Sequence, residues 1–197
     1  MPLQSFDLLL AEVRACRICA AQLPLEPRPV LQIDPRARIL LASQAPGRKA
    51  HASGVPFSDA SGERLRDWLG LAPAQFYDPA RVAIVPMGLC FPGTGRAGDL
   101  PPRPECAAHW RERLLAQLPA LRLTLLIGRY AMAYHLPASG GAVTAAVRDW
   151  RSNWPAVVPL PHPSPRNNLW LRRNPWFAQE LLPALRTQVR RVLADDD

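Results

Sequence analysis

The 197-residue sequence predicts an α/β fold, a three-layer α/β/α arrangement with a central, mainly parallel four-stranded sheet. One repeating pattern in the sequence predicts this fold class. Four short runs rich in Leu, Ile and Val alternate with longer segments of helical spacing. Buried apolar strands that alternate with helices form parallel sheets covered on both faces. The length is that of one ordinary domain, so we expect a single domain over residues 1–197.

The four predicted strands are apolar runs, and each ends at a polar or turn-forming motif. They cover residues 38–43, 81–86, 121–128 and 156–160. The motifs that follow them are SQAPG, PMGLC, GRYA and HPSPRN, in that order. In parallel sheets, binding sites form at the carboxyl ends of the strands. The functional site should therefore lie at that edge.

The predicted helices repeat apolar residues every three or four positions. They cover residues 6–16, 63–71, 104–118, 129–136, 144–150 and 175–193. In the first, Leu8, Leu9 and Val13 can share one side. The third begins with Pro104, a residue favoured in the first helical turn because its missing N–H has no partner there.

The composition favours a nucleic-acid partner and excludes a membrane protein. The net charge is +8, and the cations are arginines except for Lys49, the only lysine. Arginine makes planar, bidentate contacts to phosphate, and an excess of positive charge favours a polyanionic partner. No apolar run is long enough to span a bilayer. Because the N-terminus resembles no export signal, we expect a cytoplasmic protein, and we expect it to be a monomer.

The first motif, residues 43–62, is a Gly- and Pro-rich loop after a strand. Such a loop brings backbone N–H groups close to a ligand, although an ordinary strand-to-helix turn has the same composition. The ring of Phe57 could stack on a flat ligand or pack into the core.

The second motif begins at His162, which lies between two prolines at the end of the last strand. Small polar donors and arginines follow it, together with an apolar Leu169–Trp170 pair. A loop of this kind can hold phosphates while an apolar side chain fills the gap left by an extruded base. The candidate DNA-binding residues are Ser164, Arg166, Asn167, Asn168, Leu169, Arg172 and Arg173.

The four cysteines could form one metal site. Cys16 and Cys19 are a CxxC pair, and Cys90 and Cys106 bracket a Pro- and Gly-rich loop. Disulfides are rare in the cytosol. Four thiolates with none left over could bind zinc or a [4Fe–4S] cluster, whereas scattered buried thiols would bind neither.

In this order, the three motifs resemble the uracil-DNA glycosylase superfamily, most closely its iron–sulfur branch, called family four. That branch reads GEAPGxxEDxxGxPFVGxAG where this chain has residues 43–62, without insertion. The matching residues there are Ala45, Pro46, Gly47, Gly54, Pro56, Phe57 and Gly62. The four cysteines, the Ile127–Leu136 segment and the closing His162-Pro163-Ser164 also match, so the resemblance covers nearly the whole chain.

The resemblance implies a DNA-repair glycosylase that flips a damaged, deaminated base and hydrolyses its N-glycosidic bond without lyase activity. It assigns His162 to the leaving base and Phe57 to base stacking, with Ala45 and Met87 as further substrate contacts. It implies a [4Fe–4S] cluster, with zinc as the alternative, on Cys16, Cys19, Cys90 and Cys106.

This chain departs from the family at positions that matter for catalysis. The glutamate of motif one is Gln44, and the asparagine expected after the second strand falls at Pro86 or Met87. Gln44 can orient water, and Asp59 is the substitute carboxylate, unless it caps the following helix. Two alternatives therefore stay open: a catalytically weak damage- or single-strand-binding protein, and a zinc-bound domain that acts on RNA or a nucleotide.

Overall fold

The structure is a computed structural model that describes residues 5–96 and 98–194; the remainder of the predicted 1–197 domain lies outside the described residues. Four parallel strands form the central sheet in the order β2-β1-β5-β6. The strands of this sheet are β1 (Ile39–Ala42), β2 (Val82–Ile84), β5 (Leu123–Ile127) and β6 (Val157–Leu160). The predicted fold class is confirmed, and the sheet is entirely rather than mainly parallel.

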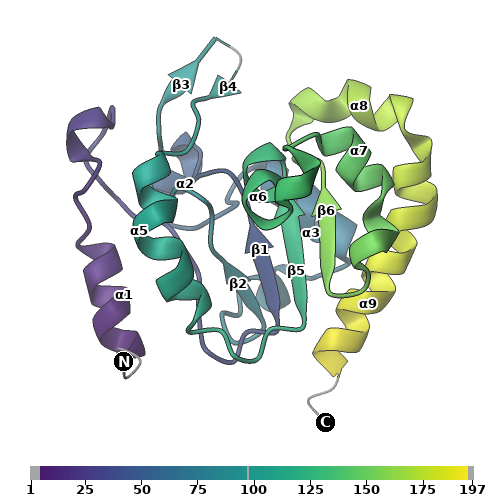
Figure 1. Cartoon of the computed structure of the whole chain (residues 1–197), viewed down its shortest axis with the longest axis horizontal. Coiled ribbons are helices and arrows are strands. Elements are labelled where there is room, and N and C mark those ends of the chain that lie inside the picture. Colours follow the sequence, from purple (N-terminus) through teal and green to yellow (C-terminus); the bar gives the residue numbers. More distant parts are fainter. Residues whose placement is uncertain (1–4, 97, 195–197) are drawn as a thin grey trace.

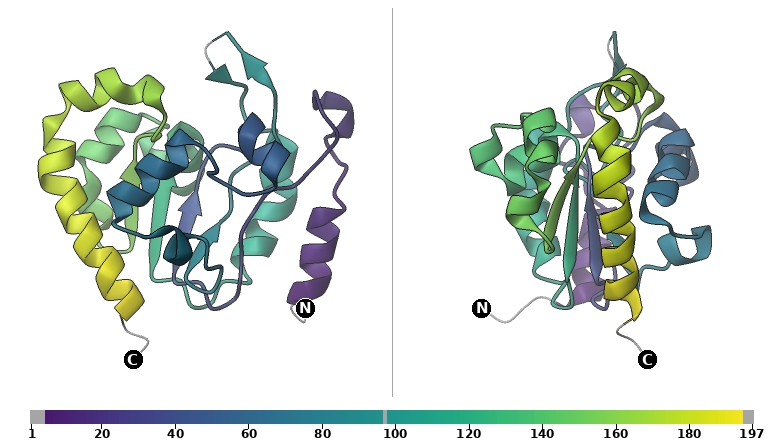
Figure 2. Two further views of the ribbon diagram at one scale, coloured as in Figure 1. Left: turned by 180° about the vertical axis from the view of Figure 1, so that it is seen from behind. Right: turned by 90° about the vertical axis from the view of Figure 1, so that its right-hand side faces the viewer.

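Helices cover both faces of the sheet (Figures 1 and 2). The α-helices are α1 (Phe6–Arg14), α2 (Arg48–Ser53), α3 (Ala60–Leu69), α4 (Pro73–Phe76), α5 (Pro104–Leu115), α6 (Arg129–His135), α7 (Val143–Arg148), α8 (Asn168–Arg173) and α9 (Leu182–Ala194). Helices α5, α6 and α7 lie on one face, and α2, α3 and α9 on the other (Figure 2). The short helical turns are η1 (Ala20–Gln22), η2 (Pro137–Ser139), η3 (Trp150–Asn153), η4 (Pro165–Asn167) and η5 (Phe177–Leu181).

Strand β1 divides the core into two clusters because successive side chains of a strand point to opposite faces. Ile39 and Leu41 belong to the larger cluster, formed with α3, α6, α7 and α9. Leu40 belongs to the smaller cluster, which packs against α1 and α5. All three side chains are at most 1% exposed, so the sheet is buried on both faces as its continuous apolar runs predict.

Several element boundaries differ from the prediction for local reasons. Helix α3 begins at Ala60 rather than residue 63 because Asp59 caps it. The closing helix starts as a π-helical turn, η5, before α9. Pro183 lies in the first turn of α9 and has no N–H to donate back to η5, which fits such an irregularity.

Besides the short helix α2, which follows β1, two further elements at the upper edge were not predicted. A small hairpin, β3 (Thr94–Gly95) and β4 (Gly98–Asp99), follows β2, and α8 forms where a loop was expected after β6. Gly98 has φ 127°, a conformation open to glycine and strained for other residues. Trp170 holds α8 by donating a hydrogen bond to Thr144 Oγ1 and by packing its ring against Phe177. Both elements follow carboxyl ends of strands, so they border the predicted site (Figure 1).

No helix in the described residues is long and apolar enough to cross a membrane.

Candidate active site

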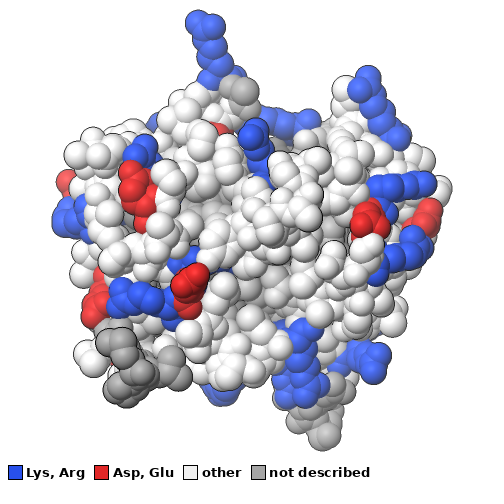
Figure 3. Space-filling model, in the orientation of Figure 1, with Lys and Arg blue, Asp and Glu red and all other residues white. Residues whose placement is uncertain are grey.

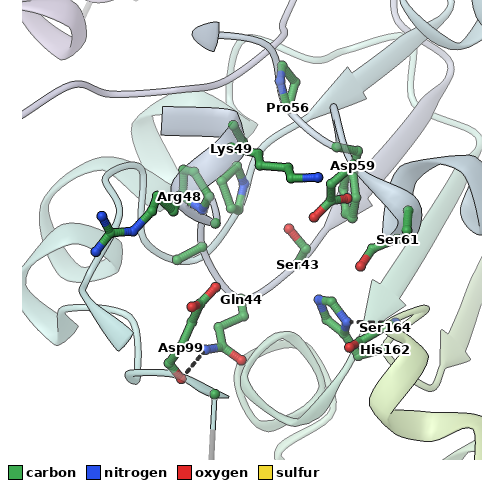
Figure 4. Close-up of a pocket in the computed structure, with 18 of the residues that line it drawn as sticks. Ser43, Gln44, Arg48, Lys49, Pro56, Asp59, Ser61, Asp99, His162 and Ser164 are labelled. Atoms are coloured by element: carbon green, nitrogen blue, oxygen red, sulfur yellow. Dashed lines mark hydrogen bonds between the residues drawn. The ribbon is translucent and has the colours of Figure 1, made fainter. Parts of the chain in front are cut away.

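A cavity of about 670 Å³ opens at the carboxyl edge of the sheet, within the size range of small-molecule sites. Its wall is built by the loop after β1, the hairpin and the loop after β6 (Figure 4). The lining comprises residues 43–50, 56–57, 59–61, 98–99, 162 and 164–167, together with Val30, Ile84 and Pro86.

The cavity brings together residues that are far apart in the sequence. Gln44, Phe57, Asp59 and His162 all line it, as predicted from their positions after strand ends. Ala45, Ser164, Arg166 and Asn167 line it as well. The convergence follows from the parallel sheet, because the loops that carry these residues share one edge.

Five predicted site residues lie elsewhere. Met87 is 5% exposed and packs in the larger core cluster, whereas its neighbour Pro86 lines the cavity. Successive residues of an extended segment point in opposite directions, so only one of these two can face the cavity. The other four lie on α8, outside the lining: Asn168, Leu169, Arg172 and Arg173.

Hydrogen bonds determine the tautomer of His162. The backbone N–H of Ser164 donates to His162 Nδ1 at 3.2 Å, so Nδ1 is an acceptor and carries no proton. Enclosure by the surrounding protein lowers the pKa of His162, and the neighbouring Asp59 and Asp99 oppose that shift only in part. A neutral ring with Nδ1 unprotonated carries its proton on Nε2. His162 can therefore donate a hydrogen bond through Nε2 at neutral pH.

Two side chains hold the loop that carries His162. Asn167 Nδ2 donates to the His162 carbonyl at 2.7 Å, and Arg64 Nη1 donates to the Ser164 carbonyl at 3.2 Å. Arg166, predicted to contact phosphate, lies against Gly98 of the hairpin, where a Cβ added to Gly98 would clash with Arg166 Nη1. The loop after β6 and the hairpin are thus packed directly together.

Phe57 occupies a strained position in the cavity wall. Its φ of 54° lies in the left-handed region, which bulky residues rarely adopt. Tyr77 donates a hydrogen bond to the Phe57 carbonyl at 3.0 Å, and a Cβ added to Gly62 would clash with the same oxygen. The glycine at position 62 therefore allows this backbone conformation. Phe57 both lines the cavity and contacts the core, where its ring meets Phe76 edge-on.

Asp59 serves as the N-cap of α3. Its Oδ1 accepts a hydrogen bond from the Gly62 N–H at 3.1 Å, the interaction that stabilises the first turn of a helix. The capping interpretation is therefore correct, and the carboxylate also lines the cavity.

Gln44 is bound to the hairpin. Its Nε2 donates to the Leu100 carbonyl at 2.9 Å and to the Asp99 carbonyl at 3.3 Å (Figure 4). The side-chain amide thus connects the turn after β1 with β4, across 55 positions of sequence.

The cavity also contains polar residues that the sequence did not single out. Ser43 lies near the centre of the wall, Lys49 points toward Asp59, and Asp99 stands beside Gln44 (Figure 4). No motif marks Asp99, because it reaches the cavity only through the hairpin. Ser43 is the first residue after β1, and its signal in the sequence was its place at the end of that strand, at the head of the motif over residues 43–62.

The four cysteines surround a second, small cavity. Cys16, Cys19, Cys90 and Cys106 all line it, between α1, the β2–α5 connection and the start of α5. Among the described residues no three His, Cys, Asp or Glu side chains lie close enough to hold a single metal ion. Burial raises the pKa of the Cys90 thiol to about 11 and that of Cys106 to about 12.

Two of the cysteine sulfurs accept a hydrogen bond from an N–H group. Trp110 Nε1 donates to Cys16 Sγ and the Leu89 N–H donates to Cys106 Sγ, both at 3.2 Å. Interactions with the Arg28 backbone and with the Arg103 side chain lower the pKa of Cys90 and of Cys19, against the larger opposite effect of burial. Such donors stabilise negative charge on sulfur.

Basic side chains protrude along the edge where the cavity opens. In Figure 3, Lys and Arg atoms extend above the hairpin and above α8, and others lie on the flanks and at the lower end, whereas the acidic atoms lie mainly on the flanks. Arg172 and Arg173 are exposed at the end of α8. This distribution suits a polyanion that approaches the carboxyl edge of the sheet.

A comparison with protein families agrees with this geometry. The family model described as "Uracil DNA glycosylase superfamily" matches residues 31–186, which contain the whole sheet and every residue of the larger cavity except Val30.

Proposed function

Because the chain belongs to the uracil DNA glycosylase superfamily, whose members are in general hydrolytic DNA glycosylases, we propose that it is a monofunctional DNA-repair glycosylase. Its substrate is a damaged, deaminated base that is flipped out of DNA. The observation that carries the proposal is the convergence of His162, Phe57 and the turn after β1 on one cavity of about 670 Å³.

His162 stabilises the departing base in this proposal. Cleavage of an N-glycosidic bond leaves negative charge on the base and positive charge on the sugar. The Nε2–H of neutral His162 donates a hydrogen bond to a base oxygen as that negative charge develops. Phe57 stacks on the flipped ring, and its strained backbone keeps it at the wall of the cavity.

The first residues after β1 recognise the edge of the base in this proposal. Backbone N–H groups near Gln44 and Ala45 face a ligand in this position, as the loop composition predicts. Ser43, which is 4% exposed, adds a hydroxyl that can donate or accept. Pro86 stands where the family carries an asparagine and has no side-chain donor, so the base need not be uracil.

DNA approaches the basic edge of the molecule. Leu169, 48% exposed on α8, is the apolar side chain that fills the gap left by the flipped base. Arg172 and Arg173 bind phosphates beside it, and Ser164, Asn167 and Asn168 supply shorter polar contacts.

A panel of oligonucleotides tests the proposed activity. Each contains one uracil, hypoxanthine or xanthine, in single- and double-stranded form, and base release is measured under single turnover. Release of at least one base, without strand cleavage, is the expected result. Lys49 lines the cavity and is the only amine side chain, so borohydride trapping is the control for lyase activity.

The second candidate is a catalytically weak DNA-binding protein of the same fold. The Gln44 amide favours this candidate. It is hydrogen-bonded to the hairpin, and an amide cannot take a proton from water. Tight binding to lesion-containing DNA without release of any base in the panel would support this candidate and refute the first.

The cysteines are proposed to hold a [4Fe–4S] cluster. Four thiols line one cavity and two of them accept N–H hydrogen bonds, which fits a group that places negative charge on four sulfurs. A cluster spaces its thiolates around several irons, whereas zinc needs all four sulfurs about 2.3 Å from one ion. When bound, the cluster would tie the N-terminal segment to α5, remote from His162, and would take no part in hydrolysis.

Absorption and metal content test this cofactor. The purified protein should absorb near 400 nm and contain iron and sulfide, and Cys90→Ser should abolish that absorption and lower the melting temperature. Stoichiometric zinc without this absorption would support the alternative metal.

A further inference from the structure

The cavity contains a carboxylate that no motif predicts, Asp99 on β4. Among the described lining residues, only Asp59 and Asp99 carry a carboxylate. The Asp99 Oδ2 lies 3.3 Å from the point that a Cβ on Gly47 would occupy, so it stands directly over the turn after β1. Thr94 Oγ1 donates to its Oδ1 at 3.2 Å and orients the group.

Gln44 holds Asp99 in this place. The Gln44 amide donates to the carbonyls of Asp99 and Leu100. Gln44, which replaces the glutamate of motif one, therefore anchors the strand that carries the Asp99 carboxylate. Arg166 packs against Gly98 from the other side. The hairpin is thereby held against both functional loops, although its own ladder joins only two residue pairs.

Asp59 is less suited to bind water. It is committed to the N-terminus of α3, and a cap loses its stabilising hydrogen bond if the side chain turns away. Asp99 caps no helix. It lies beside Gln44 on the side of the cavity opposite His162 and Ser164 (Figure 4).

We propose that Asp99 is the catalytic carboxylate that orients and deprotonates the hydrolytic water, and that Gln44 is its positioning residue. The proposal rests on the proposed function. A carboxylate supplied by the hairpin thus replaces the one that motif one lacks.

The reaction balances with these groups. The bond between the sugar C1′ and the base nitrogen breaks, and its electron pair leaves with the base, whose charge is stabilised by His162 Nε2–H. A water oxygen bonds to C1′ on the opposite face of the sugar, and its proton passes to the Asp99 carboxylate. An oxocarbenium-like centre needs little nucleophilic push, and the negative carboxylate also stabilises its positive charge. The base anion then takes up a proton from solvent and Asp99 returns its proton to solvent, so the net products are the free base and an abasic sugar and the carboxylate is regenerated.

Asp99→Asn tests the assignment. It keeps the size of the side chain and removes the proton acceptor. Single-turnover base release, on the best lesion of the wild-type protein, should slow by roughly 100-fold or more. Affinity for DNA with an abasic site and the melting temperature should stay within the error of the wild type. Asp67→Asn, on the exposed surface of α3, is the matched control and should release base at the wild-type rate.

A double-mutant cycle tests the role of Gln44. Gln44→Ala should slow base release by about 10-fold in the wild-type background and not at all in the Asp99→Asn background, because Gln44 acts through Asp99. Equal loss in both backgrounds would overturn this positioning role.

The outcomes separate this inference from the proposed function. If the wild-type protein releases a base and Asp99→Asn does so equally fast, the assignment of Asp99 is wrong and the glycosylase stands. A larger loss in Asp59→Asn than in Asp99→Asn would assign the water to Asp59 instead. If the wild-type protein releases no base, both proposals fail.

Discussion

At the scale of single residues, His162 is defined by its backbone surroundings. The Ser164 N–H fixes the acceptor at Nδ1, and enclosure lowers the pKa of the ring. Both effects favour the neutral tautomer with its proton on Nε2. The geometry of this loop therefore restrains His162 and also makes its Nε2–H a hydrogen-bond donor at neutral pH.

Replacing His162 by alanine should remove that donor. We expect base release to slow by roughly 100- to 1000-fold, the usual effect of losing one hydrogen bond to developing negative charge. DNA affinity, measured by fluorescence anisotropy on an abasic-site duplex, should change little. A loss confined to affinity would contradict the role of His162.

At the scale of elements, α8 differs from the loop that the sequence predicts. It directs Leu169 to solvent while Trp170 packs inward against Phe177. A side chain on a helix is better fixed than one on a loop, which suits an apolar wedge. The element also gathers Arg172 and Arg173 in its last turn, away from the cavity lining.

Leu169→Ala should affect double-stranded substrate selectively. Extraction of a base from a duplex leaves a gap that the wedge fills, whereas a single strand has no stack to hold open. We expect base release from duplex to fall by about 10-fold relative to release from single strands. Leu8→Ala, another exposed leucine on the remote α1, is the control and should alter neither rate. Equal losses on both substrates would argue against a wedge.

Arg172 and Arg173 should set part of the salt dependence of DNA binding. Each neutralised phosphate contributes about 0.9 to the slope of log affinity against log salt on duplex DNA. Replacing both by alanine should therefore lower the slope by nearly two. Arg190→Ala/Arg191→Ala on α9, at the opposite end of the molecule, is the matched control (Figure 1). An unchanged slope in the α8 variant would exclude these phosphate contacts.

At the scale of the whole molecule, a buried pair joins two helices to the sheet. Arg111 of α5 is 1% exposed; its Nη1 donates to the Val85 carbonyl and its Nη2 to His135 Nε2 on α6, at 2.7 Å. His135 must be neutral to accept this bond. Burial, and secondarily the charge of Arg111, lowers the pKa of His135 to about 4.

This pair predicts a loss of stability in acid. In the unfolded chain His135 regains a pKa of about 6.5, so below that pH the unfolded state binds a proton that the folded state does not. The stabilising contribution is complete above about pH 6.5 and is lost as the pH falls toward 4. His135→Gln keeps an acceptor without titrating. Between pH 7.5 and 5 the melting temperature of this variant should fall about 4–8 °C less than that of the wild type, which corresponds to roughly 2 kcal/mol. Equal decreases in melting temperature for the wild type and for His135→Gln over this pH range would refute the contribution of His135.

Local patterns in the sequence were enough to predict the fold class, the four strands of the central sheet and most of the residues of the cavity. Apolar periodicity is a local property, and parallel strands place the residues that follow them at one edge whatever the details of packing. His162, Phe57, Gln44 and Asp59 were found in this way. The motif match over residues 43–62 pointed to the same family that the comparison shows.

Which side chains face the cavity, and which are already engaged in other contacts, became visible in the structure alone. Met87 turns to the core, Asp59 caps α3, and Gln44 binds a hairpin 55 positions away. Asp99 reaches the cavity solely through that hairpin, whose strands are two residues long and show no periodicity. These outcomes depend on contacts between distant segments, and a distant contact leaves no pattern in the local sequence.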